Sequence, residues 1–218
     1  MSQDPLKKIR IRKRIEQAQA DLTAGNYAMS RKIYEDILAE EGDLPEAVHG
    51  LGILCVQERQ FDEAARLLHE ACQLEPSRAW YWNDLGEAMR MLGRTEDAIE
   101  AFCRALDTSP DFVEAMNNLG VALVGKGDLS EAKRWFVAAI QSDPSFHLPQ
   151  NNMGVVLEGE GKLEEALRYY ESAVVCKPDF SEAKENYSGL LTRHPEFVES
   201  SVGRILANAV ALKKTLET

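Results

Sequence analysis

The sequence predicts an all-α protein in which a pair of helices is repeated along the chain. Three residue types recur in phase, each 34 residues after its previous occurrence, and this interval is typical of solenoids built from helix-turn-helix units. The glycine series is Gly52, Gly86, Gly120 and Gly154, the alanine series is Ala64, Ala98, Ala132 and Ala166, and the proline series is Pro76, Pro110, Pro144 and Pro178.

Residues 113–146 show how one unit is expected to fold. Gly127 divides them into two helical stretches, because glycine readily takes the positive φ that ends a helix. Pro144 closes the unit, because proline keeps the residue before it out of the helical conformation. We expect Gly93 and Gly161 to end the first helix of their own units in the same way. The repeated glycine and alanine lack bulk, which lets the two helices of a unit approach closely.

The chain divides into segments on this 34-residue grid. The first copy is degenerate, since Ala18 and Ser30 stand where later copies have glycine and alanine. Atypical end units are expected in a solenoid, because each has only one neighbour. The predicted segments are 1–10 (basic and frayed), 11–44 (degenerate repeat), 45–78, 79–112, 113–146 and 147–180 (four clear repeats), 181–193 (partial repeat helix) and 195–216 (C-terminal capping helix).

Both ends of the chain leave two interpretations open. Apolar residues of 195–216 recur at steps of three and four, which predicts an amphipathic helix. This helix either covers the last open face of the solenoid or binds a second subunit. The basic run near the N-terminus is either a solvated first turn or a segment that docks on an acidic surface, such as another copy of the chain. That run consists of Lys7, Lys8, Arg10, Arg12, Lys13 and Arg14.

The composition limits the kinds of partner. The chain has 218 residues and a net charge of -11, which disfavours nucleic acid and anionic lipid because both bind basic surfaces. The four cysteines form no CxxC pair, no apolar run is long enough to span a membrane, and no secretion signal is visible. We therefore expect a cytoplasmic protein with no disulfide framework, no metal site, no cofactor and no membrane insertion.

Residues 79–112 carry a recognisable motif. Its members are Trp82, Leu85, Gly86 and Met89 in the first helix, followed by Ala98, Phe102, Ala105 and Pro110. This spacing closely resembles the tetratricopeptide repeat, or TPR. The resemblance implies a right-handed superhelical solenoid of helix-turn-helix TPR units. In such proteins the first helices line a concave groove that binds a peptide or a partner helix.

A row of asparagines marks the predicted groove. When each clear repeat is numbered from its first residue, positions 5 and 6 point away from the core of the unit. Position 5 holds His49, Asn83, Asn117 and Asn151, and position 6 holds Gly50, Asp84, Asn118, Asn152 and Asn186. Asparagine is a weak helix former, whereas its amide both donates and accepts hydrogen bonds, which suits binding of an extended peptide backbone. The row is similar to the asparagine ladder in the TPR superhelix of O-linked N-acetylglucosamine transferases. Alternatively, these side chains are solvated or hydrogen-bond between neighbouring repeats.

The rest of the predicted groove mixes apolar and acidic side chains. An apolar strip either contacts a hydrophobic or amphipathic ligand segment or is buried between repeats. The strip consists of Trp80 and Leu148 at position 2 and of Ile53, Val56, Val121, Val124 and Val155 at positions 9 and 12. Carboxylates outnumber the single Arg90, so the ligand should not be acidic; they are Glu46, Asp84, Glu87, Glu114 and Glu158. The predicted binding residues are His49, Trp80, Asn83, Glu87, Asn117, Asn118, Val121, Val124, Asn151, Asn152, Val155 and Asn186.

One familiar type of TPR partner is excluded by the residues of the groove. In the family that this repeat resembles, the TPR domains of co-chaperones hold the acidic C-terminal tail of Hsp70 or Hsp90 with lysine and arginine at positions 5 and 9 of the first helices. Position 5 holds no lysine or arginine here, and position 9 holds Ile53, Glu87, Val121 and Val155. We therefore expect no carboxylate clamp.

Catalysis finds little support in the sequence. The four histidines lie at unlike repeat positions, and no phosphate loop, HExxH motif or nucleophile elbow is present. We expect a non-catalytic adaptor that binds an extended or amphipathic, non-acidic polypeptide in the groove. Two alternatives are a self-assembling scaffold that uses its ends and its basic N-terminal arm, and a regulatory or substrate-recruiting subunit of a separately encoded enzyme.

Overall fold

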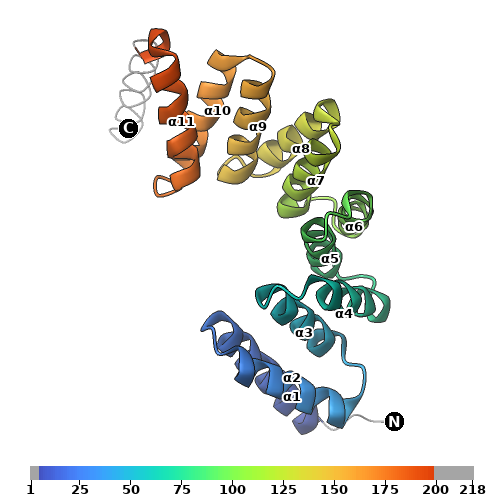
Figure 1. The fold of residues 1–218 in the computed structure, drawn as a ribbon. Coiled ribbons are helices and arrows are strands. Elements are labelled where there is room, and N and C mark those ends of the chain that lie inside the picture. The colour runs from blue at the N-terminus through green and yellow to red at the C-terminus, as the bar shows by residue number, and fades with distance from the viewer. Residues whose placement is uncertain (1–4, 199–218) are drawn as a thin grey trace, which may run out of the picture. The chain divides into compact units, whose positions relative to one another are not determined.

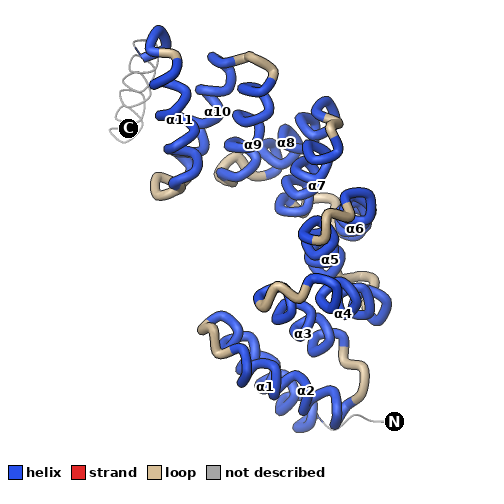
Figure 2. The backbone as a smooth tube through the Cα atoms, viewed as in Figure 1, coloured by secondary structure: helices blue, strands red, loops and turns tan. Residues whose placement is uncertain are grey.

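The structure is a computed structural model that describes residues 5–198, and every regular element within them is a helix (Figures 1 and 2). The α-helices are α1 (Pro5–Thr23), α2 (Tyr27–Glu41), α3 (Pro45–Gln57), α4 (Phe61–Leu74), α5 (Ala79–Met91), α6 (Thr95–Thr108), α7 (Val113–Lys126), α8 (Leu129–Ser142), α9 (His147–Gly159), α10 (Leu163–Cys176) and α11 (Ser181–Arg193), followed by the 3₁₀-helix η1 (Pro195–Phe197). The predicted all-α class and its helix-turn-helix pairs are confirmed.

The chain divides into two compact units, residues 1–135 and 136–218, with the boundary inside α8. In unit 1, α1 packs on α2, α3 on α4 and α5 on α6, and each second helix also packs on the next first helix. The first helices α1, α3, α5 and α7 contact one another in sequence, so their sides form one continuous surface. In unit 2, α10 packs on both α9 and α11.

The repeated glycine lies where the two helices of a pair cross. A Cβ atom on Gly86 would lie 2.5 to 2.8 Å from three ring atoms of Phe102, and one on Gly154 would lie 2.5 to 3.1 Å from the ring of Tyr170. Both rings are almost completely buried. Because close-packed interiors leave no spare volume, a glycine is needed at this position for the ring to fit.

The turns between paired helices take the conformation that the sequence predicts. Gly93, Gly127 and Gly161 have φ values of 73°, 90° and 75°. The second repeat has Arg59 at the corresponding turn, and this residue adopts the same left-handed conformation with φ of 62°. A side chain at positive φ is strained, so Arg59 occupies a site that glycine would fill with less strain.

The first repeat compensates for its unusual residues. Ser30 and Ala18 are both fully buried, and the Ser30 hydroxyl donates a 2.8 Å hydrogen bond to the carbonyl oxygen of Ala18. The polar atom that distinguishes Ser30 from the alanine of other repeats is therefore satisfied inside the core.

The N-terminal boundary differs from the prediction. Helix α1 begins at Pro5, so the expectation that residues 1–10 fray is wrong for residues 5–10. Salt bridges from Lys7 to Glu41 (2.8 Å) and from Arg14 to Glu40 (2.7 Å) tie this longer helix to α2. The 34-residue interval, counted back from the later repeats, placed the start at Ile11. The first helices of those repeats are shorter than α1.

The C-terminal boundary is tested only in part. Helix α11 coincides with the predicted helix 181–193. Of the predicted capping helix 195–216, only the beginning is described, and it contains η1. The remainder of that prediction lies outside the described residues.

Candidate functional site

The candidate site is the side of α3, α5 and α7 that carries repeat positions 2, 5, 6, 9 and 12. We call it the first-helix face of unit 1. Trp80 at position 2 is 47% exposed, whereas Asn83 and Asn117 at position 5 are only 8% and 4% exposed. The other predicted residues of this face, His49, Glu87, Asn118, Val121 and Val124, are half-buried. The asparagines at position 5 therefore lie beneath the surface, which Trp80 and these half-buried side chains form.

Side-chain hydrogen bonds join the three helices of this face. The Nδ2 atom of Asn118 donates to Oδ1 of Asn83 at 3.1 Å, which links α7 to α5. Nε2 of His49 lies 2.7 Å from Oδ2 of Asp84, which links α3 to α5. Within α5 and α7, Asn83 donates to Asp84 (3.4 Å) and Asn117 donates to Asn118 (3.2 Å). The result is one hydrogen-bonded chain from His49 to Asn117.

Unit 2 repeats the same arrangement. Nδ2 of Asn186 on α11 donates to Oδ1 of Asn151 on α9 at 3.0 Å, and Asn151, only 1% exposed, donates to Oε1 of Glu182 at 2.9 Å. Asn152 is half-buried, and Val155 on the same helix is 45% exposed. In both units the bond joins position 5 of one repeat to position 6 of the next, which are 35 residues apart.

These contacts give the asparagines a structural role. The sequence left open whether they bind a ligand or bridge neighbouring repeats, and the hydrogen bonds show bridging for Asn83, Asn118, Asn151 and Asn186. Bridging does not use up the amide of Asn118, which engages one of its two N–H groups and one of the two lone pairs of its oxygen in the bonds to Asn83 and Asn117. Contact between this half-buried amide and a ligand stays a prediction.

The row of position 6 is interrupted at Gly50. A Cβ atom on Gly50 would overlap the buried ring of Tyr34 in the second helix of the first repeat. Any larger side chain at residue 50 would displace this ring, so the asparagine row cannot extend there. Sequence reasoning missed why residue 50 is a glycine, because the reason is a contact between two repeats.

Aromatic groups cluster beside the hydrogen-bonded chain. The ring of His49 stacks on that of Tyr81 at a centroid distance of 4.4 Å, and Trp80 meets Tyr81 edge to face at 5.9 Å. The guanidinium carbon of Arg78 lies 4.9 Å from the centre of the Trp80 ring, a cation–π contact. Burial raises the pKa of the Tyr81 phenol, which therefore stays neutral. Sequence reasoning found Trp80 but missed Arg78 and Tyr81.

The acidity of the face is lower than the sequence suggests. Asp84 contacts His49, and both carboxylate oxygens of Glu87 accept hydrogen bonds from Arg90 at 3.1 and 2.9 Å. In unit 2, Glu158 accepts a hydrogen bond from Tyr170 (2.8 Å) and forms a salt bridge with Arg193 (2.7 Å). Of the five carboxylates named from the sequence, Glu46 and Glu114 form no ion pair within the described residues.

The predicted apolar strip is only partly accessible. Ile53 and Val56 of α3 are half-buried and pack against the core. Val121 and Val124 of α7 are half-buried as well, and Leu148 of α9 has the same intermediate exposure. Of the residues in the predicted strip, Trp80 in unit 1 and Val155 in unit 2 are therefore the exposed ones.

A charged trough extends the first-helix face towards the N-terminus. It has a volume of about 1000 Å³ and lies between α1, the loop after α2 and the start of α3. Lys8 and Arg12 line it from α1, Asp43 from the loop after α2, Glu46 from the start of α3, and Arg78 from the loop before α5. The sequence could not reveal this trough, because it requires α1 to continue beyond the 34-residue grid.

Residues 5–198 contain no group of three or more histidine, cysteine or acidic side chains arranged to hold a metal ion. No described helix combines the length and apolar character needed to cross a bilayer. The four cysteines are free thiols, and burial raises the pKa of Cys72 from 9.0 to about 12, so this thiol is not an activated nucleophile.

Comparison with known proteins identifies the repeat. A family model described as tetratricopeptide repeat matches residues 49–111, 92–145 and 118–179, which together cover more than half of the chain. The chain is similar to the peroxisomal targeting signal receptor of Eremothecium gossypii, with 36% identity over 93 residues that make up 41% of this chain and 16% of the receptor. The receptor of Saccharomyces cerevisiae is 35% identical over 71 residues, or 33% of this chain and 12% of the receptor. The chain thus spans less than a fifth of these relatives.

Solved structures show the same fold at lower identity. TTC0263, a thermophilic TPR protein of Thermus thermophilus, is 18% identical with a TM-score of 0.70, covering 84% of this chain and 99% of its own. MamA is 22% identical with a TM-score of 0.66, covering 76% and 96%. YrrB, described as a TPR protein with an unusual peptide-binding site, is 23% identical with a TM-score of 0.63, covering 79% and 89%. The chain belongs to the tetratricopeptide repeat family.

Proposed function

We propose that the protein is a non-catalytic adaptor that holds an extended or amphipathic polypeptide segment on the first-helix face of unit 1. Membership of the TPR family implies protein or peptide binding, and two similar proteins are described as a targeting signal receptor and as a protein with a peptide-binding site. The observation that carries the proposal is the exposed ring of Trp80 beside the polar row formed by His49, Asp84 and Asn118.

The polar row suits a polypeptide backbone. Its side chains are already held in place by bonds between helices, so binding loses little conformational entropy in ordering them. Asn118 keeps one N–H group and one lone pair, which can donate to a backbone carbonyl and accept a backbone N–H. Preorganised amides of this kind favour backbone recognition over recognition of a particular side chain.

The surroundings of Trp80 define the side chains that the ligand should carry. Position 2 of the neighbouring repeats holds Glu46 and Glu114, and neither carboxylate forms an ion pair within the described residues. Arg78 already covers part of the indole. An apolar or aromatic ligand residue on the open part of Trp80, with lysine or arginine beside it to meet Glu46 or Glu114, is the best match. We therefore propose a non-acidic ligand, and the acidic Hsp70 or Hsp90 tail does not fit.

The proposal is tested with peptides selected on the intact protein. A displayed library of random peptides is screened against the immobilised chain, and the affinity of a selected peptide is measured by fluorescence polarisation. Trp80→Ala and Asn118→Ala should each weaken binding by about tenfold or more, because each removes one anchor of the face. Leu74→Ala is the matched control, since Leu74 is 40% exposed on the second helix α4 and should not alter affinity.

Two outcomes would overturn this function. One is that no peptide is selected. The other is that selected peptides bind Trp80→Ala and Asn118→Ala as tightly as the unaltered chain while circular dichroism shows that helical content is retained.

A further inference from the structure

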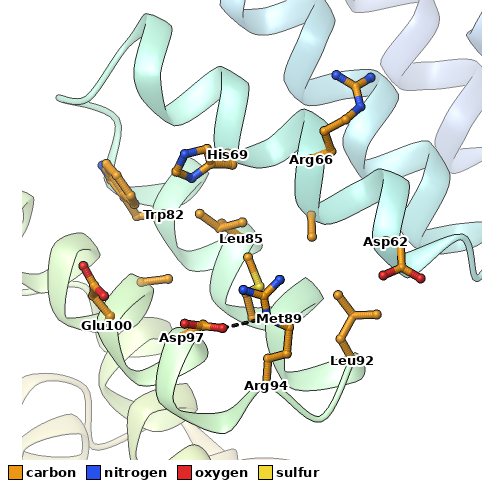
Figure 3. Close-up of a pocket in the computed structure, with 12 residues that line it drawn as sticks. Asp62, Arg66, His69, Trp82, Leu85, Met89, Leu92, Arg94, Asp97 and Glu100 are labelled. Carbon is orange, nitrogen blue, oxygen red and sulfur yellow. Dashed lines mark hydrogen bonds and ion pairs between the residues drawn. The ribbon is translucent and has the colours of Figure 1, made fainter.

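A second accessible surface of unit 1 lies on the side of α5 away from Trp80. A cavity of about 440 Å³ opens there between α4, α5 and α6, and Figure 3 shows Leu85, Met89 and Leu92 along its floor. Ala65 of α4 and Ala101 of α6 complete the apolar lining. We call this cavity the α4–α6 slot. It takes no part in the proposed peptide-binding face, because positions 7 and 11 of α5 point opposite to positions 2 and 6.

The slot exists because two small residues coincide at one junction between repeats. Ala65 and Ala101 lie at repeat positions 21 and 23, and facing helices bring them to the same cavity. The corresponding pairs at the other junctions of unit 1 are Arg31 with Leu67 and Ile99 with Trp135. Each of those pairs is much larger. Within unit 1, the small pair Ala65 and Ala101 therefore belongs to the junction of the second and third repeats.

The rim of the slot offers carboxylates. Arg66 is held by Glu63 and Glu70, and Arg94 is held by Asp97 at 2.6 Å. Asp62 forms no ion pair within the described residues, and the nearest cation to Glu100 is Arg104 at 3.8 Å. An occupant of the slot should therefore combine apolar side chains with lysine or arginine.

Helix α1 of the same chain presents this combination. Leu6 and Ile9 are 75% and 53% exposed and lie one turn apart. Arg10 and Lys13 line the same surface and form no ion pair within the described residues, whereas Arg14 is tied to Glu40 of α2. We call Leu6, Ile9, Arg10 and Lys13 the α1 patch. Because α1 is packed on α2 and α3, its patch is fixed on the surface rather than on a mobile tail.

We propose that the α1 patch of one copy docks in the α4–α6 slot of a second copy. Leu6 and Ile9 cover the apolar floor at Met89 and Leu92, and Arg10 and Lys13 face Asp62 and Glu100. The contact joins two different surfaces, and each copy carries one α1 patch and one α4–α6 slot. The assembly therefore grows head to tail as an open chain or closes into a ring. One helix face buries a small area, so association is weak, and screening of the charges by salt weakens it further.

Sedimentation of the full chain over a concentration series, at low and high salt, tests this contact. A patch variant, Leu6→Ser with Ile9→Ser, removes the exposed apolar side chains. A slot variant, Ala65→Leu with Ala101→Leu, fills the cavity with residues that occur at these positions in other repeats, Leu167 and Leu67. Each variant should lower the association constant at least about tenfold. Val175→Ser, at a 69% exposed residue of unit 2, is the control and should associate like the unaltered chain.

Mixing the two variants gives the sharpest result. The slot variant keeps its patch and the patch variant keeps its slot, so the mixture should form 1:1 dimers and nothing larger. A chain that stays monomeric at all concentrations contradicts the proposal, as does association that survives in both variants or a mixture without dimers. Should the slot variant fail to fold, Asp62→Lys with Glu100→Lys serves in its place, because both side chains are exposed, and the same outcomes decide.

Discussion

Replacing Asn151 with alanine measures what the bridging asparagines contribute to stability. Asn151 is 1% exposed and makes two hydrogen bonds, to Glu182 at 2.9 Å and from Asn186 at 3.0 Å. Each bond contributes about 1 kcal/mol to the free energy of unfolding. Alanine is the better helix former by about 0.6 kcal/mol, which offsets part of the loss. The variant should be less stable by roughly 1.5 kcal/mol, which lowers the melting temperature by about 3 to 6 °C.

The sign of the change decides between two accounts. If the bonds contribute nothing, helix propensity alone makes Asn151→Ala more stable than the unaltered chain by about 0.6 kcal/mol. Thermal and urea unfolding followed by circular dichroism distinguish a loss from a gain. A double-mutant cycle with Asn186→Ala should give a coupling energy of about 1 kcal/mol, because the two amides bond to each other directly. A stabilised variant or zero coupling would refute the bridging role.

Three further predictions concern the scaffold. Gly86→Ala should lower the free energy of unfolding in urea by about 1 to 3 kcal/mol, because its Cβ would press on Phe102. Gly125→Ala is the control in α7 with open space around it, and it should be neutral or stabilising by up to about 1 kcal/mol. Equal effects of the two changes would contradict this packing. Arg59→Gly should stabilise by about 1 kcal/mol in the same assay, because glycine relieves the strain of φ at 62°, and a loss of stability would show that Arg59 has another role. Stability should fall as the pH rises above about 9. The Cys72 thiol ionises at its ordinary pKa of 9.0 in the unfolded chain, but burial raises its pKa to about 12 in the folded chain. This difference lowers the free energy of unfolding by about 1.4 kcal/mol at pH 10. Melting temperatures of Cys72→Ala should decline less steeply over this range, and parallel curves would contradict the assignment.

The repeat grid could be predicted from the sequence because each of its residues has a local reason. Gly86 and Phe102 must pack together, and Gly127 must take a positive φ, so these residue types recur at fixed spacing. The start of α1 could not be predicted in this way. Salt bridges such as that of Lys7 with Glu41 stabilise its first residues, and such contacts leave no periodic signal in the sequence.

The candidate site was harder to predict because its roles depend on how neighbouring repeats are offset. Positions 5 and 6 both carry asparagine, yet Asn83 is buried and Asn118 is half-buried, and the bond between them follows from an offset that a single repeat does not contain. The ring of Tyr34 occupies the space that a side chain at Gly50 would need, and this too is a contact between repeats. The α4–α6 slot likewise arises only when Ala65 and Ala101 come from two repeats to one cavity.

Binding of a polypeptide to the first-helix face of unit 1 can be followed through the indole signals of the tryptophans. The chain has three tryptophans. Trp80 is exposed on the first-helix face, whereas Trp82 lies at the α4–α6 slot with its indole N–H bonded to the carbonyl oxygen of Pro76 at 2.9 Å. A selected peptide is titrated into ¹⁵N-labelled protein and the indole resonances are followed by NMR. We predict that the Trp80 resonance shifts on binding while that of Trp82 stays in place; a shift of Trp82 with Trp80 unchanged would contradict the account.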